Sequence, residues 1–390
     1  MVFHRQFLIF IAKLIKQQNN EVGALFSISL LSSYLSGFLI LKIGLVLLGA
    51  FVMGALFYWI YWHVTHPDQG FEYVSDAGWS TRSFELETDR KSALRVMTYN
   101  MGWAVGPVQK AVRDQIELGA YQENLDEIVR VIKDNDVDIV LLQEADVDAS
   151  RSHRLDQVAY LQEKLEWSYV AQVADWKRWI PFEGVRNMHR CLAVLSKYPI
   201  VKHAYKRFTF YPNLKSKFLT FMYNPFIWKS STQHVQIVHN DATLNVFNVH
   251  LSVLSEANRL HQMNDLVAWA KRDGLMKNLI VGGDFNFQGQ VNARGFELKT
   301  PLEDKLSLGL LQELWQAIPG MQEAFISSTS TLQDIHEHVT FIAEKHRYDF
   351  LFFSEHFQKV HAQVIQGISV SDHFPVCVAL HRLPSEPSKY

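Results

Sequence analysis

The sequence has little cysteine and no surplus of positive charge. Its two cysteines, Cys191 and Cys377, each lie within an apolar run, so we expect two separate buried thiols rather than a disulfide or a zinc site. Four of the 38 Lys and Arg residues and four of the 40 Asp and Glu residues lie in residues 1–79, which leaves the remainder slightly acidic. Proteins that grip long nucleic acids usually carry a basic surplus. The charge balance therefore disfavours a nuclease without excluding one.

Charge is also nearly absent from the N-terminal region. Between Val22 and Trp62 the sole charged residue is Lys42, and Ile43–Trp62 is long enough to cross a bilayer as a helix. That stretch ends in aromatic residues typical of the headgroup level, namely Tyr58, Trp59, Tyr61 and Trp62. We favour one span over Ile43–Trp62, and a hairpin in which Val22–Leu41 forms a first span is the alternative. The apolar region is too long for a cleaved signal peptide and lacks a small-x-small cleavage site.

Basic residues precede this apolar region. Arg5, Lys13 and Lys16 lie in a stretch typical of an amphipathic helix on a membrane surface, and residues 65–80 contain no Lys or Arg. By the positive-inside rule, one span places the rest of the chain on the non-cytoplasmic side, whereas two spans keep it in the cytoplasm. We divide the chain into an amphipathic and transmembrane anchor, a linker, a folded domain and a tail, at residues 1–62, 63–93, 94–382 and 383–390.

Within the folded domain, strand-like runs are interspersed with helical periodicity. Runs typical of strands occur at residues 94–100, 137–144, 192–196, 235–238, 244–250, 279–281, 348–353 and 376–380. Helical spacing occurs at residues 121–134, 155–165 and 256–271. The order is too irregular for a βαβ repeat. It predicts an α/β fold in which two mixed sheets pack face to face, with helices outside.

Polar side chains follow the ends of these strands. They are Asn100, Glu144, His250, Asp284, Asn286, Asp349, Asp372 and His373. A carboxylate at a strand end is by itself usually a turn-former or a helix cap. Eight residues of metal-ligand or proton-transfer type favour one shared site at one rim. Oxygen ligands, a positioned water and an imidazole are the groups that metal-assisted phosphate chemistry requires.

Seven short motifs connect these residues with a known family. They are Thr98–Asn100, Leu142–Glu144, Leu192–Ile200, Asn248–Leu251, Gly283–Asn286, Tyr348–Leu351 and Ser371–Pro375. Their order resembles the endonuclease/exonuclease/phosphatase superfamily of metal-dependent phosphoesterases, over roughly 95–380. The resemblance implies a four-layered α/β sandwich with its catalytic domain at 94–382. The apolar N-terminal segment predicts a membrane-anchored member of this superfamily.

The resemblance also implies a metal site for Mg²⁺, with Mn²⁺ as an alternative ion. Glu144 would be the main carboxylate ligand, helped by Asn100 and Asp372. Mg²⁺ prefers hard oxygen ligands and keeps several waters, so one or two carboxylates and the substrate phosphate suffice. Zinc is less expected, because the motifs offer mostly oxygen rather than closely spaced Cys and His.

The remaining roles follow from the same resemblance. Asp284 would orient or deprotonate the attacking water, and Asn286 would hold the phosphate or the metal. His373 would contact the phosphoryl oxygens, kept in one tautomer by Asp349. His250 would donate to the developing negative charge.

The sequence departs from the family at 187–191, where a glycine is common ahead of the Leu-Ala-Val-Leu-Ser run. Asn187 and Arg190 are therefore no more than candidates for binding the substrate.

The substrate is less defined than the chemistry. Aromatic and basic residues alternate in 205–229, a pattern that suits an insertion packed on its own domain, a bilayer interface or stacking on bases. We favour a phosphodiesterase or phosphatase that acts near a membrane, for instance on lipid headgroups in the manner of neutral sphingomyelinases. A membrane-tethered nuclease and an inactive relative that serves as a binding module are the alternatives. The intact set of metal and imidazole positions argues against the inactive relative, and no protein partner can be inferred.

Overall fold

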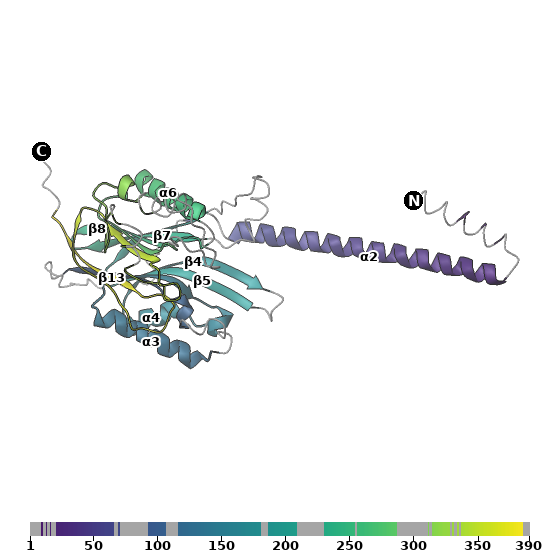
Figure 1. Ribbon diagram of the computed structural model, residues 1–390, viewed down its shortest axis with the longest axis horizontal. Coiled ribbons are helices and arrows are strands. Elements are labelled where there is room, and N and C mark those ends of the chain that lie inside the picture. The colour runs from purple at the N-terminus through teal and green to yellow at the C-terminus, as the bar shows by residue number, and fades with distance from the viewer. Residues whose placement is uncertain are drawn as a thin grey trace. The chain divides into compact units, whose positions relative to one another are not determined.

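The computed structural model describes most of the chain (Figure 1). Apart from isolated positions, it describes residues 21–65, 69–70, 93–106, 116–180, 186–208, 230–253, 256–286, 314–327 and 337–384. The predicted N-terminal amphipathic helix, most of the linker and most of the aromatic and basic segment lie outside the described residues, and so does the tail beyond 384. The chain divides into two units, Met1–Pro67 and Asp68–Tyr390.

The first unit contains one continuous helix, α2 (Glu21–Thr65). Its segment Ser36–Tyr61 has a mean hydropathy of 2.4 and is long and apolar enough to cross a membrane. The helix continues through Lys42, where a two-span hairpin would need a turn, so the hairpin is not formed. The helix also extends beyond the predicted end of the anchor at Trp62.

The second unit is built on two mixed β-sheets. In one sheet the order is β1 (Gln69–Gly70), β6 (Ile200–Arg207), β7 (Ser231–His239), β8 (Ala242–His250), β9 (Leu279–Asp284), β11 (Asp349–Phe353) and β10 (Gln322–Glu323). In the other it is β12 (Phe357–Val364), β13 (Val376–Arg382), β2 (Leu94–Asn100), β3 (Ile139–Asp146), β5 (Arg186–Ser196) and β4 (Tyr169–Ile180). The pairs β2–β3 and β8–β9 are parallel. Because parallel strands end at the same edge of a sheet, each pair brings two chain segments to one rim.

Helices cover the outer face of each sheet, which confirms the predicted four layers (Figure 1). One sheet packs against α3 (Leu118–Asp134) and α4 (Gln157–Leu165), and the other packs against α6 (Glu256–Arg272). Leu125, Ile128 and Ile132 form the buried face of α3 at helical spacing. Between the sheets, Leu141 and Val194 from one sheet belong to the same apolar cluster as Val246 from the other.

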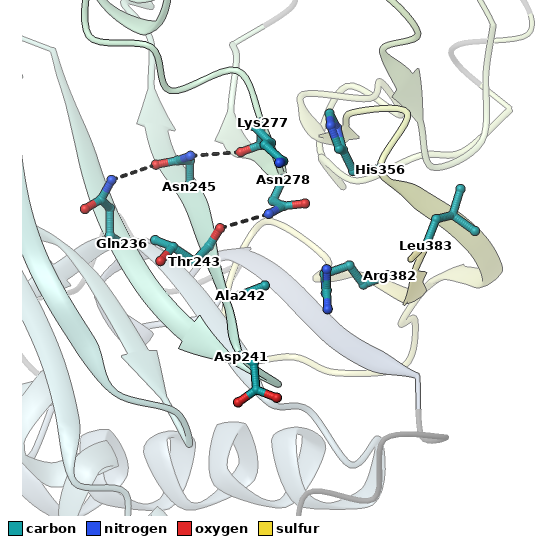
Figure 2. A pocket seen from close by; sticks show the side chains of 10 residues that line it. All are labelled: Gln236, Asp241, Ala242, Thr243, Asn245, Lys277, Asn278, His356, Arg382 and Leu383. Carbon is teal, nitrogen blue, oxygen red and sulfur yellow. Dashed lines mark hydrogen bonds between the residues drawn. The ribbon is translucent and has the colours of Figure 1, made fainter. Parts of the chain in front are cut away.

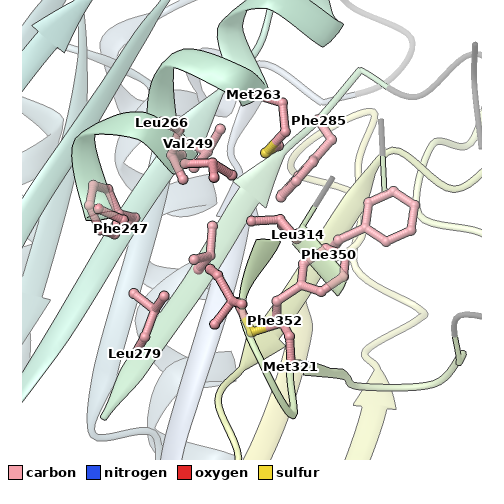
Figure 3. Packing of buried hydrophobic residues seen from close by; sticks show 14 of the residues in the cluster. Phe247, Val249, Met263, Leu266, Leu279, Phe285, Leu314, Met321, Phe350 and Phe352 are labelled. Atoms are coloured by element: carbon pink, nitrogen blue, oxygen red, sulfur yellow. The ribbon is translucent and has the colours of Figure 1, made fainter. Parts of the chain in front are cut away.

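The core under α6 holds the strands that carry the predicted site (Figure 3). Met263 and Leu266 of α6 are fully buried in one cluster with Phe247 and Val249 of β8 and with Phe350 of β11. Burying each of these side chains contributes roughly 1.5–3 kcal/mol to the free energy of folding. This layer therefore fixes the strands that end in His250 and Asp284.

Several strands differ from the sequence analysis. The sequence analysis missed β4, β6, β10 and β12, and Gln69 of the predicted linker pairs with Lys206 as part of β1. The strands predicted at 235–238 and 244–250 are formed and pair as the β7–β8 hairpin, with positive φ at Asn240 and Asp241 as a type I′ turn requires. As predicted, the two cysteines are free and buried.

Candidate active site

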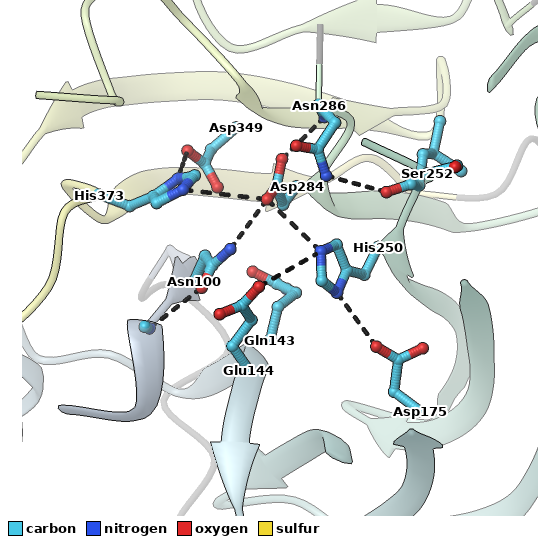
Figure 4. Close-up of polar contacts among 12 residues, drawn as sticks. Asn100, Gln143, Glu144, Asp175, His250, Ser252, Asp284, Asn286, Asp349 and His373 are labelled. Atoms are coloured by element: carbon cyan, nitrogen blue, oxygen red, sulfur yellow. Dashed lines mark hydrogen bonds and ion pairs between the residues drawn. The ribbon is translucent and has the colours of Figure 1, made fainter. Parts of the chain in front are cut away.

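The predicted polar residues gather at one rim of the two sheets (Figure 4). Asn100 and Glu144 come from the parallel pair β2–β3, and His250 and Asp284 come from the parallel pair β8–β9. In the register, His250 lies opposite Asp284, which in turn lies opposite Asp349. Strand pairing alone therefore aligns three of the predicted residues.

Asp284 lies at the centre of this arrangement. Its Oδ2 accepts a hydrogen bond from Asn100 Nδ2 at 2.8 Å, and its Oδ1 accepts one from the backbone N–H of Asn286 at 2.7 Å. The Nε2 atoms of His250 and His373 lie 3.7 Å and 4.0 Å from Oδ2. Burial raises the pKa of Asp284, although the charges of the two imidazoles oppose the shift.

His373 is oriented by a buried carboxylate. Its Nδ1 lies 2.8 Å from Asp349 Oδ2, and both side chains are almost fully buried. Burial lowers the pKa of His373, but the charge and hydrogen bond of Asp349, together with Asp284, raise it to about 9. The pair thus orients His373 with Nε2 facing Asp284.

His250 is oriented in the same way by Asp175, a residue that the sequence analysis missed. His250 Nδ1 lies 3.2 Å from Oδ2 of Asp175, which is buried in β4. Burial lowers the pKa of His250, but the neighbouring carboxylates of Asp175 and Asp284 together outweigh burial and raise this pKa. The signal was present, because Asp175 follows the strand-like run Tyr169–Ala174 much as Glu144 follows its own strand.

Glu144 reaches the site through a β-bulge. Gln143 and Glu144 of β3 together oppose one residue of β5, and Glu144 adopts a φ of 54°. A positive φ is uncommon for a residue with a Cβ and often marks a functional position. Glu144 Oε1 accepts a hydrogen bond from Arg190 Nη1 at 3.0 Å and lies 3.8 Å from His250 Nε2.

Arg190 is a buried link between two carboxylates. Its Nη2 donates to Asp175 Oδ2 at 2.6 Å while Nη1 donates to Glu144. Arg190 thus belongs to the site and holds two of its acidic side chains in position. Asn187, the other predicted substrate contact, belongs to β5 opposite Trp179, and its side chain lies outside the described part of the chain.

Asn286 and Asp372 complete the predicted set. Asn286 Nδ2 donates to the backbone oxygen of Leu251 at 2.9 Å, so its amide braces the loop after β8. Asp372 is buried beside Ser371, whose hydroxyl lies 2.8 Å from the backbone oxygen of Asn100 and 3.4 Å from Asp372 Oδ1. All the predicted residues except Asn187 therefore have described side chains at this rim.

The donor chemistry of the rim fits a divalent metal. Its carboxylates and amides supply the hard oxygen ligands that Mg²⁺ and Mn²⁺ prefer. Within the described residues, Asp349 Oδ1 is buried without a hydrogen-bond partner, so the site has acceptor capacity that no protein donor satisfies. Asp284, Asp349 and His373 each offer a ligand atom within 4.8 Å of the others, a group different from the predicted ligands.

A separate cleft lies at the opposite ends of β8 and β13 (Figure 2). It has a volume of about 450 Å³ and is lined by polar side chains such as Lys277, His356 and Arg382. None of the predicted site residues lines it.

Comparison with known proteins identifies the family. A model of the Endonuclease/Exonuclease/phosphatase family matches residues 97–373. The chain belongs to this family. Family membership makes it a hydrolase of phosphate esters, in a family that generally depends on divalent metals. A comparison with curated proteins gave no match.

Solved structures of the Endonuclease/Exonuclease/phosphatase family share the fold. A member from Beutenbergia cavernae has a TM-score of 0.53 and 20% identity, over 76% of this chain and 73% of that chain. A member from Bacteroides vulgatus has a TM-score of 0.50 and 15% identity, over 75% and 100%. A mannosyl-6-phosphatase from Bacteroides thetaiotaomicron has a TM-score of 0.50 and 17% identity, over 74% and 99%. At these identities the likeness concerns the fold alone.

Proposed function

We propose that this family member is a metal-dependent phosphodiesterase that acts on phosphate diesters near a membrane. The observation that carries the proposal is the pair of imidazoles at Asp284. His250 Nε2 and His373 Nε2 lie 3.7 Å and 4.0 Å from the same carboxylate oxygen, and each ring is backed by a buried Asp. Diester hydrolysis needs one group that takes a proton from water and others that hold the charged phosphoryl oxygens.

In this proposal Asp284 orients the attacking water and accepts its proton. Asn100 Nδ2 and the backbone N–H of Asn286 hold the carboxylate in place, and its raised pKa makes it a stronger base than an ordinary Asp. His373 keeps its proton because of Asp349 and binds the phosphoryl oxygens. His250 lies on the other side of Asp284 and donates a hydrogen bond to the negative charge that develops during the reaction.

Glu144, Asn100 and Asp372 would hold Mg²⁺, with Mn²⁺ as an alternative. A bound divalent ion would neutralise charge on the phosphate and on the leaving oxygen. Arg190 already donates to Glu144 and Asp175, which supports a role in positioning these carboxylates over direct contact with the substrate. Asn286 would steady the loop that carries Asp284 as well as contact the phosphate or the metal.

The membrane part of the proposal rests on α2 and on charge. The apolar Ser36–Tyr61 segment suits one span, and the basic residues before it suit a cytoplasmic N-terminus. The catalytic domain would then lie on the non-cytoplasmic side. A slight acidic excess beyond residue 79 favours a lipid headgroup or a similar diester over nucleic acid.

The test is a substrate panel with the full chain in detergent micelles and Mg²⁺. The panel contains bis-p-nitrophenyl phosphate, p-nitrophenyl phosphate, vesicles with sphingomyelin or phosphoinositides, and plasmid DNA. We expect turnover of the diester and of at least one lipid, lost on removal of the metal with a chelator. Asp284→Ala is the inactive control, and Asp273→Ala, which changes an exposed Asp after α6, is the matched control.

Each other result points to a different function. Turnover of the monoester alone would make the chain a phosphatase, and cleavage of DNA without lipid turnover would support the nuclease alternative. Absence of any turnover would support an inactive binding module. Activity that survives in Asp284→Ala would refute the catalytic assignment.

A further inference from the structure

A short hairpin, residues 340–346, lies against the catalytic imidazole. Ile342 N–H donates to the backbone oxygen of Asp372 at 2.9 Å, and Phe374 N–H donates to that of Thr340 at 2.7 Å. These two bonds flank His373, and Phe341 forms a β-bridge with His373 itself. The 340–346 hairpin is therefore attached to the segment that carries the imidazole.

The same hairpin is attached to the strand of Asp349. The buried hydroxyl oxygen of Thr340 accepts hydrogen bonds from the backbone N–H groups of Tyr348 and Asp349, at 2.9 Å and 3.1 Å. Phe341 N–H donates to the backbone oxygen of His346 at 2.8 Å and closes the hairpin. Since both members of the Asp349–His373 pair hold it, the hairpin is a fixed wall of the site.

This wall is apolar where it meets the site. The ring of Phe341 lies 4.9 Å from the ring of His373, centroid to centroid, and stacks on Tyr348 at 4.9 Å with an interplanar angle of 21°. Phe341 and Ile342 are half-buried and Ala343 is exposed, so three consecutive apolar residues of the hairpin keep accessible surface. Charged or sugar-like groups would find no hydrogen-bonding side chain on these three residues.

We propose that the 340–346 hairpin selects diesters that carry an apolar substituent on the phosphate, with Phe341 as the specificity-determining residue. The inference rests on the proposed phosphodiesterase function and adds the chemical class of one substrate group. With the phosphoryl oxygens on His373, an apolar group on the ester oxygen that does not leave covers the Phe341 ring and removes apolar surface from water. Selection therefore acts through contact with the substrate, and Phe341 takes no part in proton transfer.

The test compares two substrates that differ in one substituent. Methyl p-nitrophenyl phosphate and butyl p-nitrophenyl phosphate release the same chromophore and are offered to the full chain in detergent micelles with Mg²⁺. We expect the wild type to prefer the butyl diester. Phe341→Ala should raise KM for the butyl diester about tenfold, with kcat and the methyl diester little changed.

Two further variants keep the result interpretable. Phe341→Leu retains an apolar side chain and should retain most of the butyl preference, whether or not Phe341→Ala folds well. Val360→Ala on the exposed face of β12 is the matched control and should change neither substrate.

The outcomes separate this inference from the function on which it rests. Equal effects of Phe341→Ala on both diesters, or a loss of kcat with KM unchanged, would show that Phe341 only positions His373 and would overturn the inference. A wild type without butyl preference would overturn it as well, while leaving diester hydrolysis intact. Failure of the wild type on both diesters would overturn the proposed function and the inference together.

Discussion

Individual side chains of this site act in pairs. His373 and His250 each have Nδ1 beside a buried carboxylate, so both rings present Nε2 to Asp284. A carboxylate in this position fixes the tautomer and orientation of an imidazole. In other hydrolytic sites, replacing such a carboxylate lowers the catalytic rate strongly. The pairing of Asp349 with His373 agrees with the sequence analysis, whereas Asp175 emerges from the three-dimensional structure.

The first prediction concerns Asp175. Asp175→Asn should lower kcat by a factor of roughly 10²–10⁴ with little change in KM, because His250 loses the partner that sets its tautomer. The Asp175→Asn/His250→Gln double variant should lose little more than either single variant, since the two residues act as one unit. Steady-state kinetics on a chromogenic diester measure this.

Because Arg190 also binds Asp175, thermal melting of each variant should accompany the kinetics. Asp148→Asn, an exposed acidic control, should keep full activity. Independent, multiplicative losses in the double variant would contradict a shared role for Asp175 and His250.

The second prediction separates the two candidate metal sets. Glu144→Gln should weaken Mn²⁺ binding on the order of 10²-fold, whereas Asp349→Asn should keep most of the affinity and lose activity, because Asp349 is engaged by His373. Calorimetric titration with Mn²⁺ measures affinity without any turnover. The reverse ranking would assign the metal to Asp284, Asp349 and His373 instead.

At the scale of strands and helices, the sequence predicts those elements that have a local hydrophobic pattern. The apolar runs before Glu144 and Asp284 and the amphipathic spacing of α3 were sufficient to predict their elements. By contrast, β12 alternates poorly because half of its residues are exposed, and β4 is stabilised by pairing with β5 over its whole length. Edge strands of this kind depend on contacts distant in sequence. Asp175 follows a strand-like run in the sequence, but its contact with His250 of the other sheet depends on such distant contacts and could not be predicted.

The third prediction concerns Gly283 in β9. A Cβ at this position would lie 1.9 Å from the backbone oxygen of Val249, in a backbone with a φ of 151° that residues with side chains rarely adopt. Gly283→Ala should therefore lower the free energy of unfolding by more than about 3 kcal/mol and disrupt the β8–β9 rim. Chemical denaturation measures the change.

Gly119 in α3 provides the control, because a Cβ there meets no atom within 4 Å. Gly119→Ala should be neutral or stabilise the fold by up to about 1 kcal/mol. Equal stability of the two alanine variants would show that the β8–β9 pairing can shift to admit a methyl group.

The fourth prediction concerns pH and the core under α6. Burial lowers the pKa of His234 to about 4, next to Asn245 and the Trp269 ring. Because the unfolded chain titrates near 6.5, it binds more protons between these values. The stability that this difference in pKa provides is fully present above pH 6.5. The free energy of unfolding falls by about 3 kcal/mol as the pH approaches 4. His234→Gln should flatten the dependence of unfolding free energy on pH in this window, whereas His381→Gln on the surface should not.

At the scale of the whole chain, the two units differ in whether their apolar residues are exposed or buried. In the described part of α2, the Ser36–Tyr61 segment has none of its residues buried by protein and spans roughly 39 Å at 1.5 Å per residue. The hydrocarbon core of a bilayer is about 30 Å thick. The domain beyond it buries its own apolar residues in two sheets and their helices. Membrane attachment and catalysis should therefore be separable.

The fifth prediction is that residues 68–390 suffice for chemistry and residues 1–67 for attachment. The piece 68–390 retains β1 and its pairing with β6, so it should fold and hydrolyse a soluble diester with kcat within about twofold of the full chain. The full chain should stay with membranes after a carbonate wash, while the shorter piece should remain in the supernatant. Turnover of lipid in vesicles should fall in the shorter piece, because it loses the local concentration that an anchor supplies. Retention of the shorter piece on vesicles would mean that a second surface of the catalytic domain contacts the bilayer.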